Sequence, residues 1–323
     1  MLDKVYSLCL KGNVTEAYEY LQELEQNKTV ERLTKQYYNR FFSEKPKLRY
    51  KSKDSWIKNV IHSYYEYYIS VLTKEKSTEE AEITLFQRLL SLLNDSDQLK
   101  DMDKIEELLA EQFQKRGYYF QGGVTQPYRG PYIWKHQEKV DYTILLPSGY
   151  QKVSVYFLSD FIIQSWLHFA TFGKLATGGW ATKDALYCVK DRYKKGLDTP
   201  DFVYSYLTHE AQHFVDYREF PSLDTRELEY RAKLVELIYH PFNNKRLIKK
   251  FLTQAEKNNP NPHSHASFAV CTNLSKLIFE IEMETDLNNW RKINPKTLSS
   301  HALALFHLHT DLLTNQRKSL VDR

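Results

Sequence analysis

The stretch YLTHEAQHF, residues 206–214, contains the pattern His-Glu-x-x-His and decides how the rest of the chain is interpreted. The pattern lies in a predicted helix, where about 3.6 residues per turn place His209 and His213 on one face, one turn apart. Neutral imidazole nitrogens are good zinc ligands, so the two side chains together predict a metal site. Glu210 lies about 100° further round the helix, where its carboxylate can accept a proton from water instead of binding the ion.

The surroundings of the motif distinguish a functional site from a coincidence. A shuffled chain of this composition would contain the motif only about 0.03 times. The apolar neighbours Val203, Leu207 and Val215 predict a largely buried helix. Two buried histidines without partners would cost free energy, so burial favours a bound ion over an exposed helix that carries the motif by accident.

A catalytic zinc site needs a third protein ligand, and the next predicted helix offers the candidates. Glu227 is explained by a capping box with Asp224 at the start of that helix. Glu229 lies on the face expected to pack against the first helix, so it is the favoured ligand. Glu236 is interpreted as a solvated helix residue, and His240 is a less favoured contender.

The remainder of the chain predicts a mostly helical α+β protein. Ten Gly and ten Pro among 323 residues favour long helices over many tight turns. Short strands are expected at residues 142–146, 152–157, 177–182 and 185–189. The predicted regions are a helical N-terminal region (1–115), a catalytic core (116–245) and a C-terminal helical subdomain (246–323).

Charge and cysteine content bear on partners and on compartment. The 45 Lys and Arg and the 41 Asp and Glu are spread along the chain, so the net charge of +4 predicts no nucleic-acid partner. Three widely spaced cysteines form neither a disulfide framework nor a CxxC zinc site, which fits a reducing compartment. Without a signal segment or a run of about 18 apolar residues, we expect a cytoplasmic protein with no membrane partner. Signal-independent export would leave no mark in the sequence.

The motif and the downstream glutamate resemble the gluzincin group of zinc peptidases, in which HExxH is followed on a second helix by a glutamate ligand. The segment EYRA, residues 229–232, is similar to part of the third-ligand motif of the Ste24/HtpX-like family, where an aspartate stands at the position of Lys233. GGWA, residues 178–181, resembles the edge strand before the active-site helix of thermolysin-like gluzincins. Its glycines would admit a substrate backbone or simply form a turn. The resemblance implies a zincin-like core that holds Zn²⁺.

The resemblance also implies a mechanism, in which a peptide or protein substrate is hydrolysed by water. Glu210 would act as the base and then deliver the proton to the leaving amine. Gluzincins commonly stabilise the carbonyl oxygen with a downstream His or Tyr, and His265 and Tyr239 are the candidates here. Asp216, two turns from His209, would either orient a ligand imidazole or form a salt bridge with Arg218 or Lys233.

Three alternatives stay open at this point. The first is a zinc-binding scaffold that no longer hydrolyses peptides and binds a protein partner through its N-terminal helices. The second is a helical interaction module with a coincidental motif. The third is a nucleic-acid binder that uses the basic residues of 45–53 and 245–250.

Overall fold

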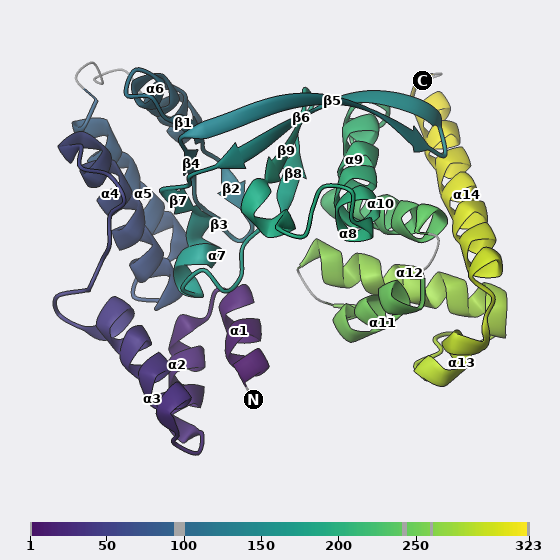
Figure 1. The fold of residues 1–323 in the computed structure, drawn as a ribbon, viewed down its shortest axis with the longest axis horizontal. Coiled ribbons are helices and arrows are strands. Elements are labelled where there is room, and N and C mark those ends of the chain that lie inside the picture. The colour runs from purple at the N-terminus through teal and green to yellow at the C-terminus, as the bar shows by residue number, and fades with distance from the viewer. Residues whose placement is uncertain (1, 94–100, 241–243, 259–260, 322–323) are drawn as a thin grey trace. The chain divides into compact units, whose positions relative to one another are not determined.

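The structure is a computed structural model that describes residues 2–93, 101–240, 244–258 and 261–321 (Figure 1). It is mostly helical with small sheets, as expected for the α+β class. The chain forms two compact units, residues 1–137 with 158–177 and residues 138–157 with 178–323. Within the described part of the chain, no helix combines the length and the apolar composition needed to cross a membrane.

The boundaries of these units differ from the predicted boundaries at 115/116 and 245/246. Two long strands, β5 (His136–Leu146) and β6 (Gly149–Ser159), carry the chain into the second unit and back to the first. The chain therefore enters the second unit twice, and a division into three consecutive segments does not describe it.

Helices dominate the first unit. Its helical elements are α1 (Leu2–Leu10), α2 (Val14–Glu23), α3 (Lys28–Tyr37), the π-helical turn η1 (Tyr38–Phe42), α4 (Ser55–Leu72), α5 (Thr78–Ser91), α6 (Met102–Gln114) and α7 (Ser165–Ala170). Its strands form a sheet in the order β1-β4-β7 and a separate pair, β2-β3. They are β1 (Tyr119–Gln121), β2 (Val124–Thr125), β3 (Tyr128–Arg129), β4 (Tyr132–Trp134) and β7 (Ile163–Gln164).

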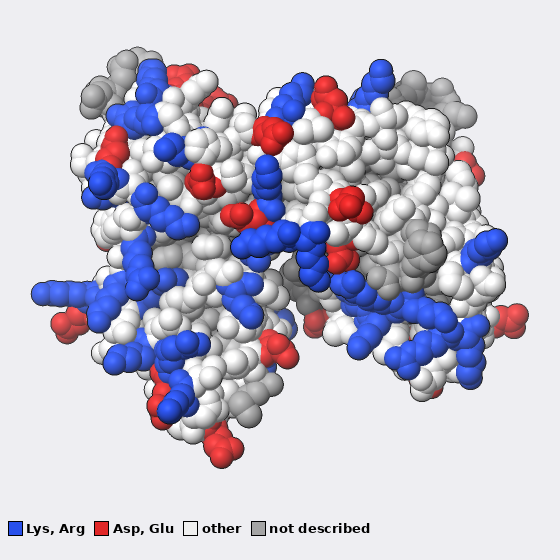
Figure 2. Space-filling view, in the orientation of Figure 1, with Lys and Arg blue, Asp and Glu red and all other residues white. Residues whose placement is uncertain are grey.

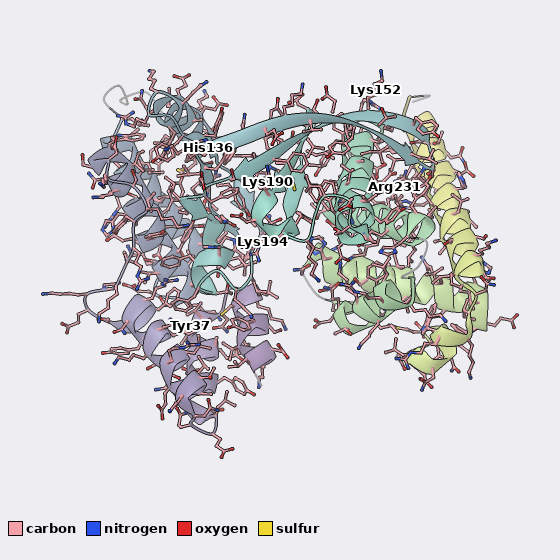
Figure 3. The ribbon with its side chains drawn as sticks, in the orientation of Figure 1. Tyr37, His136, Lys152, Lys190, Lys194 and Arg231 are labelled. Atoms are coloured by element: carbon pink, nitrogen blue, oxygen red, sulfur yellow. The ribbon has the colours of Figure 1, made fainter. Side chains whose placement is uncertain are left out.

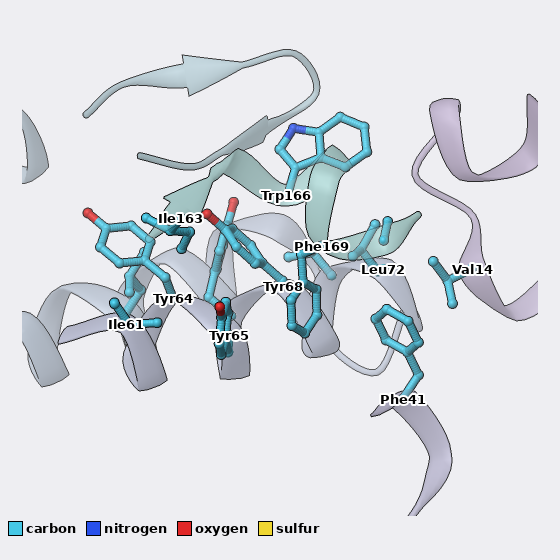
Figure 4. Packing of buried hydrophobic residues seen from close by; sticks show 14 of the residues in the cluster. Val14, Phe41, Ile61, Tyr64, Tyr65, Tyr68, Leu72, Ile163, Trp166 and Phe169 are labelled. Carbon is cyan, nitrogen blue, oxygen red and sulfur yellow. The ribbon is translucent and has the colours of Figure 1, made fainter. Parts of the chain in front are cut away.

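Aromatic side chains of α4 form much of the core of the first unit (Figure 4). Tyr64 and Tyr68 are fully buried, and the ring of Tyr65 stacks on Phe169 of α7 with centroids 4.6 Å apart. The buried hydroxyl of Tyr64 donates a hydrogen bond to Oε1 of Glu106, 2.9 Å away. Large rings thus supply the apolar area while the buried hydroxyl keeps a partner.

The second unit contains the motif. Its strands form one sheet in the order β5-β6-β9-β8, with β8 (Gly179–Ala181) and β9 (Leu186–Val189) following the two long strands. Its helical elements are the 3-10 helix η2 (Lys190–Tyr193), α8 (Pro200–Phe202), the π-helical turn η3 (Val203–Leu207), α9 (Thr208–Glu219), α10 (Thr225–Tyr239), α11 (Asn244–Gln254), α12 (Pro262–Phe279), α13 (Leu287–Lys292) and α14 (Pro295–Val321).

One face of this sheet packs against the helix that carries the motif. Val153, Val155 and Phe157 alternate along β6 and are buried, as expected when one face of a strand covers a core. The ring of Phe202 in α8 lies 5.9 Å from that of Phe157, and Ala211 of α9 is fully buried in the same cluster. The sheet therefore supports α9 from one side.

Strands β8 and β9 pair antiparallel, which confirms the two short strands predicted before the motif helix. A Cβ on Gly179 would clash with the ring of Tyr206, and one on Gly178 would lie 2.6 Å from the hydroxyl of Tyr193. The glycines therefore let tyrosines of the following helical segments approach the strand. This packing is a reason for Gly-Gly that the sequence did not suggest.

The C-terminal helices complete the core of the second unit. Phe251 of α11, Val270 of α12 and Phe306 of α14 are buried in one cluster with Val155 of the sheet. The expected C-terminal subdomain at 246–323 therefore shares its core with the region predicted to be catalytic.

Basic residues gather on one part of the second unit. Figure 2 shows a band of Lys and Arg over α11 and α13, whereas charges of both signs are interspersed elsewhere on the drawn face. The exposed basic side chains on these two helices are Lys245, Arg246, Lys249, Lys250, Arg291 and Lys292. The basic residues of the stretch 245–250 thus lie on the solvent-facing side of α11, whereas Leu247 and Ile248 of the same stretch lie in the core.

Candidate metal centre

The motif lies in a helical segment that begins as the sequence predicts. Thr199 is the N-cap, its hydroxyl accepts a hydrogen bond from the backbone N–H of Phe202, and Pro200 occupies the first turn. The segment then widens into the π-helical turn η3 before α9 starts at Thr208. Such wide turns often lie beside functional residues.

The helix that supplies the acidic residue also starts as predicted. Asp224 caps α10, its side chain accepts from the backbone N–H of Glu227 at 2.8 Å, and the Glu227 side chain returns to the backbone of Asp224. The side chain of Glu227 therefore already has a partner in this capping box. Glu229, half a turn further on, faces α9, and Ala232 is fully buried, where its small side chain permits close packing.

His209, His213 and Glu229 converge in the interior, with residue exposures of 7%, 6% and 9%. The two Nε2 atoms are 3.1 Å apart. Oε1 of Glu229 lies 3.3 Å from Nε2 of His213, and Oε2 lies 3.5 Å from Nε2 of His209. Each residue offers one ligand atom, so the group could hold a metal ion.

These separations match the dimensions of a small tetrahedral site. Zinc bonds to nitrogen and oxygen of about 2.0–2.1 Å at tetrahedral angles separate neighbouring ligand atoms by about 3.3–3.4 Å. The two Nε2 atoms are 3.1 Å apart, and the distances of 3.3 and 3.5 Å from them lead to different oxygens of Glu229, so each separation is close to that value. The spacing and the chemistry of the donors therefore fit one cation of this size.

Glu236 corrects the sequence interpretation, which made it a solvated residue. It is 1% exposed, and its Oε1 lies 2.8 Å from Nδ1 of His209. Because a carboxylate can only accept, Nδ1 carries a proton, and in the neutral imidazole Nε2 then presents its lone pair toward His213 and Glu229. Glu236 follows Glu229 by seven residues, two turns along the same helix face, and this spacing is the signal that could have revealed it.

The electrostatics of the group favour positive charge. Burial lowers the pKa of His209, but hydrogen bonds with Glu229 and Glu236 outweigh this effect and raise it to about 10. Burial raises the pKa of Glu229, but the imidazoles of His263, His209 and His213 outweigh this and hold it well below the usual carboxyl range. The buried carboxylates therefore stabilise a positive charge here, either a proton on His209 or a cation beside it.

Glu210 lies beside the cluster and not within it, as its position on the helix predicts. Its side chain is half-buried, and burial raises the pKa of its carboxyl, partly opposed by the neighbouring His209 and His213. The ring of Tyr217, one turn after His213, stacks on that imidazole with centroids 6.3 Å apart. A carboxylate with a raised pKa next to a cation site is suited to accept a proton near neutral pH.

The structure places the two predicted carbonyl-stabilising residues away from the cluster. His265 lines a separate cavity of about 570 Å³ between α10, α12 and α14. Tyr239 ends α10, ten residues or about 15 Å along the helix from Glu229. The histidine that reaches the cluster is His263, whose Nδ1 lies 2.6 Å from Oε2 of Glu229.

Asp216 takes neither of the two predicted roles. It is fully buried, and both its carboxylate oxygens accept hydrogen bonds from Nε of Arg231 at 3.0 Å. Arg231, labelled in Figure 3, also donates to Thr310 of α14. Arg218 pairs instead with Glu219. Asp216 thus belongs to a buried pair that joins α9, α10 and α14 behind the cluster.

Replacing Asp216 with alanine is expected to destabilise the folded chain by about 3–5 kcal/mol, because the guanidinium of Arg231 stays buried without its carboxylate. Denaturant unfolding followed by circular dichroism measures the loss. Asp201→Ala is the control: it removes the exposed partner of Arg246 and is expected to cost less than about 1 kcal/mol. Equal losses for the two variants would contradict the structural role of the buried pair.

Two remaining side chains occupy other surroundings. His240 follows the end of α10, and its ring lies 5.2 Å from that of Tyr204. Lys233 is 2% exposed, with its ammonium 4.6 Å above the ring of Phe251. Burial lowers the pKa of Lys233, opposed by Glu236 and Glu229. Asp216 pairs with Arg231 and not with this lysine.

Within the described residues, the centre consists of His209, His213 and Glu229, with Glu236 behind one imidazole and Glu210 beside the group. All five side chains come from α9 and α10, which pack against each other in the second unit. No protein-family model, curated protein or solved structure matches the chain.

Proposed function

We propose that the chain is a zinc-dependent peptidase whose second unit is a zincin-like core. The observation that carries the proposal is the convergence of one ligand atom each from His209, His213 and Glu229, all within 4.8 Å of one another in the interior. Zinc in catalytic sites binds three protein ligands and keeps the fourth position for water or substrate. Three converging ligands match that number.

The donor set favours a transition metal such as zinc over calcium or magnesium. Two imidazole nitrogens and one carboxylate oxygen are a common zinc combination, whereas calcium and magnesium prefer oxygen ligands only. The hydrogen bond from His209 to Glu236 adds the carboxylate–histidine arrangement that orients ligand imidazoles and raises their basicity.

The residues around the centre divide the work of hydrolysis. A bound zinc ion would supply Lewis acidity, which activates water and polarises the carbonyl of a peptide bond. Glu210 accepts the proton from that water and then delivers it to the nitrogen of the leaving amine. Burial of Glu210 raises the pKa of its carboxyl, which suits a group that first takes and then returns a proton.

The proposal is tested on the full chain, purified without chelator. We expect about one zinc ion per chain by metal analysis and cleavage of a mixture of quenched fluorescent peptides, with the cleavage abolished by a zinc chelator and restored by added zinc. Stoichiometric zinc without cleavage of any peptide would favour the scaffold alternative. Absence of stoichiometric zinc would favour the interaction module with a coincidental motif.

A further inference from the structure

Helices α11 and α13 form a strongly basic surface in the unit that holds the centre. They pack against each other, and neither helix contains an acidic residue. The band of Lys and Arg over them is visible in Figure 2. We call this surface the basic patch, and it consists of the exposed side chains of Lys245, Arg246, Lys249, Lys250, Arg291 and Lys292.

The basic patch concentrates the positive charge of the chain. Its six charges exceed the net charge of +4, so the rest of the chain carries a small negative net charge. Among the residues that the structure describes, Arg246 is the one member of the patch at ion-pair distance from an acid, 3.4 Å from Asp201. Arg291 and Lys292 donate to neutral side-chain amides of their own helix. Charge complementarity therefore calls for an anionic partner.

The other side chains of the two helices narrow the kind of anion. Their aromatic residues, Phe251 and Trp290, are buried, so neither helix exposes a ring that could stack on a nucleic-acid base. Leu247 and Ile248 are also buried, and neither helix exposes a large apolar side chain that could enter a lipid surface. The anion that the patch already contacts, on Arg246, is a carboxylate.

Helix α11 lies against both helical segments that supply the centre. The ammonium of Lys233, one turn after Glu229 on α10, lies 4.6 Å above the ring of Phe251 of α11. Arg246 pairs with Asp201 of α8, the first turn of the helical segment that continues into the motif. A polypeptide held on α11 therefore lies beside the helices that carry the ligand residues.

We propose that the basic patch binds acidic segments of the polypeptide that the centre cleaves. The inference rests on the proposed function and adds a substrate class to it, polypeptides with several Asp or Glu residues away from the cleaved bond. Four of the six basic residues are lysines, whose ammonium groups are point charges on flexible stems and can meet carboxylates in many geometries. Such a surface raises the rate of substrate association, and salt weakens its effect.

The first measurement is binding to the full chain, which requires no cleavage. Fluorescence anisotropy follows a labelled peptide of alternating Glu and Ser and its counterpart with Gln in place of Glu. At low salt, the wild type is expected to bind the Glu peptide about 10-fold more tightly than the Gln peptide, and added salt should remove the difference. Lys249→Glu with Lys250→Glu is expected to abolish the preference, and Lys249→Gln with Lys250→Gln to reduce it.

A matched control changes the same amount of charge elsewhere in the same unit. Lys139 and Lys152 are exposed on β5 and β6, and Lys139→Glu with Lys152→Glu is expected to keep the preference of the wild type. Thermal unfolding shows whether each variant retains the fold. Equal loss of the preference in the control would overturn the proposal, because the net charge of the chain would then be the cause.

The second measurement is cleavage of two quenched fluorescent peptides that share the same central sequence. One carries an acidic extension, and the other carries the extension with Gln in place of Glu. At low salt, the wild type is expected to have a kcat/KM about 10-fold higher for the acidic peptide, and the ratio should fall to near one in Lys249→Glu with Lys250→Glu. Cleavage of both peptides at the same rate by the wild type would overturn the proposal.

The remaining outcomes separate the patch from its foundation. A preference of wild-type size in Lys249→Glu with Lys250→Glu would overturn the proposal, because the acidic peptide would then bind elsewhere. Tighter binding of duplex DNA or of phosphatidylserine vesicles than of the Glu peptide at the same salt would also overturn it in favour of a phosphate-bearing partner. Binding of the Glu peptide without cleavage of either quenched peptide would overturn the proposed function and leave the patch as a binding surface for acidic polypeptides.

Discussion

Glu210→Gln is expected to lower kcat/KM for peptide hydrolysis by about 10²- to 10⁴-fold and to leave about one zinc ion per chain. The substitution keeps the size of the side chain and removes its capacity to accept a proton. Glu210 lies outside the converging ligands, so the cation keeps its three protein contacts. Parallel assays of fluorescent peptide cleavage and metal content check both halves of the expectation.

A second glutamate on the same helix provides the matched control. Glu219 is the last residue of α9 and pairs with Arg218 near the surface. Glu219→Gln is expected to retain wild-type activity. Unchanged hydrolysis in Glu210→Gln would rule out this residue as the base, and loss of zinc in that variant would reassign it to metal binding.

His213→Ala is expected to abolish stoichiometric zinc, because two ligands remain of the three that a catalytic site requires. It should also abolish the stabilisation that zinc gives the folded chain. A ligand at about 1,000 times its Kd stabilises the state that binds it by about 4 kcal/mol. Thermal unfolding with and without zinc, together with metal analysis, measures both effects.

A histidine on another helix tests whether the effect is specific. His307 is exposed on α14, and His307→Ala is expected to keep one zinc ion and the full shift on adding zinc. A shift of wild-type size in His213→Ala would place the zinc elsewhere on the chain. Loss of the shift in both variants would point to nonspecific binding by surface histidines.

The sequence was most informative where chemistry and helical period coincide. The i, i+4 spacing placed both imidazoles on one face, and capping by Asp224 accounted for Glu227 and left Glu229 as the favoured acidic ligand. The structure brings Glu229 to the two histidines and keeps Glu227 in the cap. These expectations depend on a few residues of local sequence, which is why they could be made without a fold.

The sequence was least informative about partners that meet only in three dimensions. Asp216 and Arg231 lie on different helices, and the sequence pointed to Arg218 of the same helix or to Lys233, two residues after Arg231, instead. His263 reaches Glu229 from α12, which no spacing within α9 or α10 could indicate. Glu236 differs from these two cases, because its seven-residue spacing from Glu229 is visible in the sequence. A glutamate in a helix is ordinarily solvated, so this spacing alone did not suggest a buried partner for His209.

The predicted domain boundaries differ from the limits of the compact units for a related reason. Composition changes near residue 117, where helices give way to strands, and the boundary was placed there. The compact units divide instead near residues 137 and 158, within long strands whose sequence carries no break. Composition reports the type of local structure, whereas the division into units follows from which apolar faces share a core.

The π-helical turn between Val203 and Leu207 sets the angular phase of the metal motif. In an unbroken α-helix, Phe202 and His209 are seven residues apart and would project from nearly the same side. The wider turn takes up an extra residue and rotates everything beyond it by roughly a quarter of a revolution. The same helical segment can therefore pack the ring of Phe202 against the sheet and direct the imidazole of His209 toward α10. The direction of both imidazoles thus depends on the π-helical turn, which itself contributes no ligand.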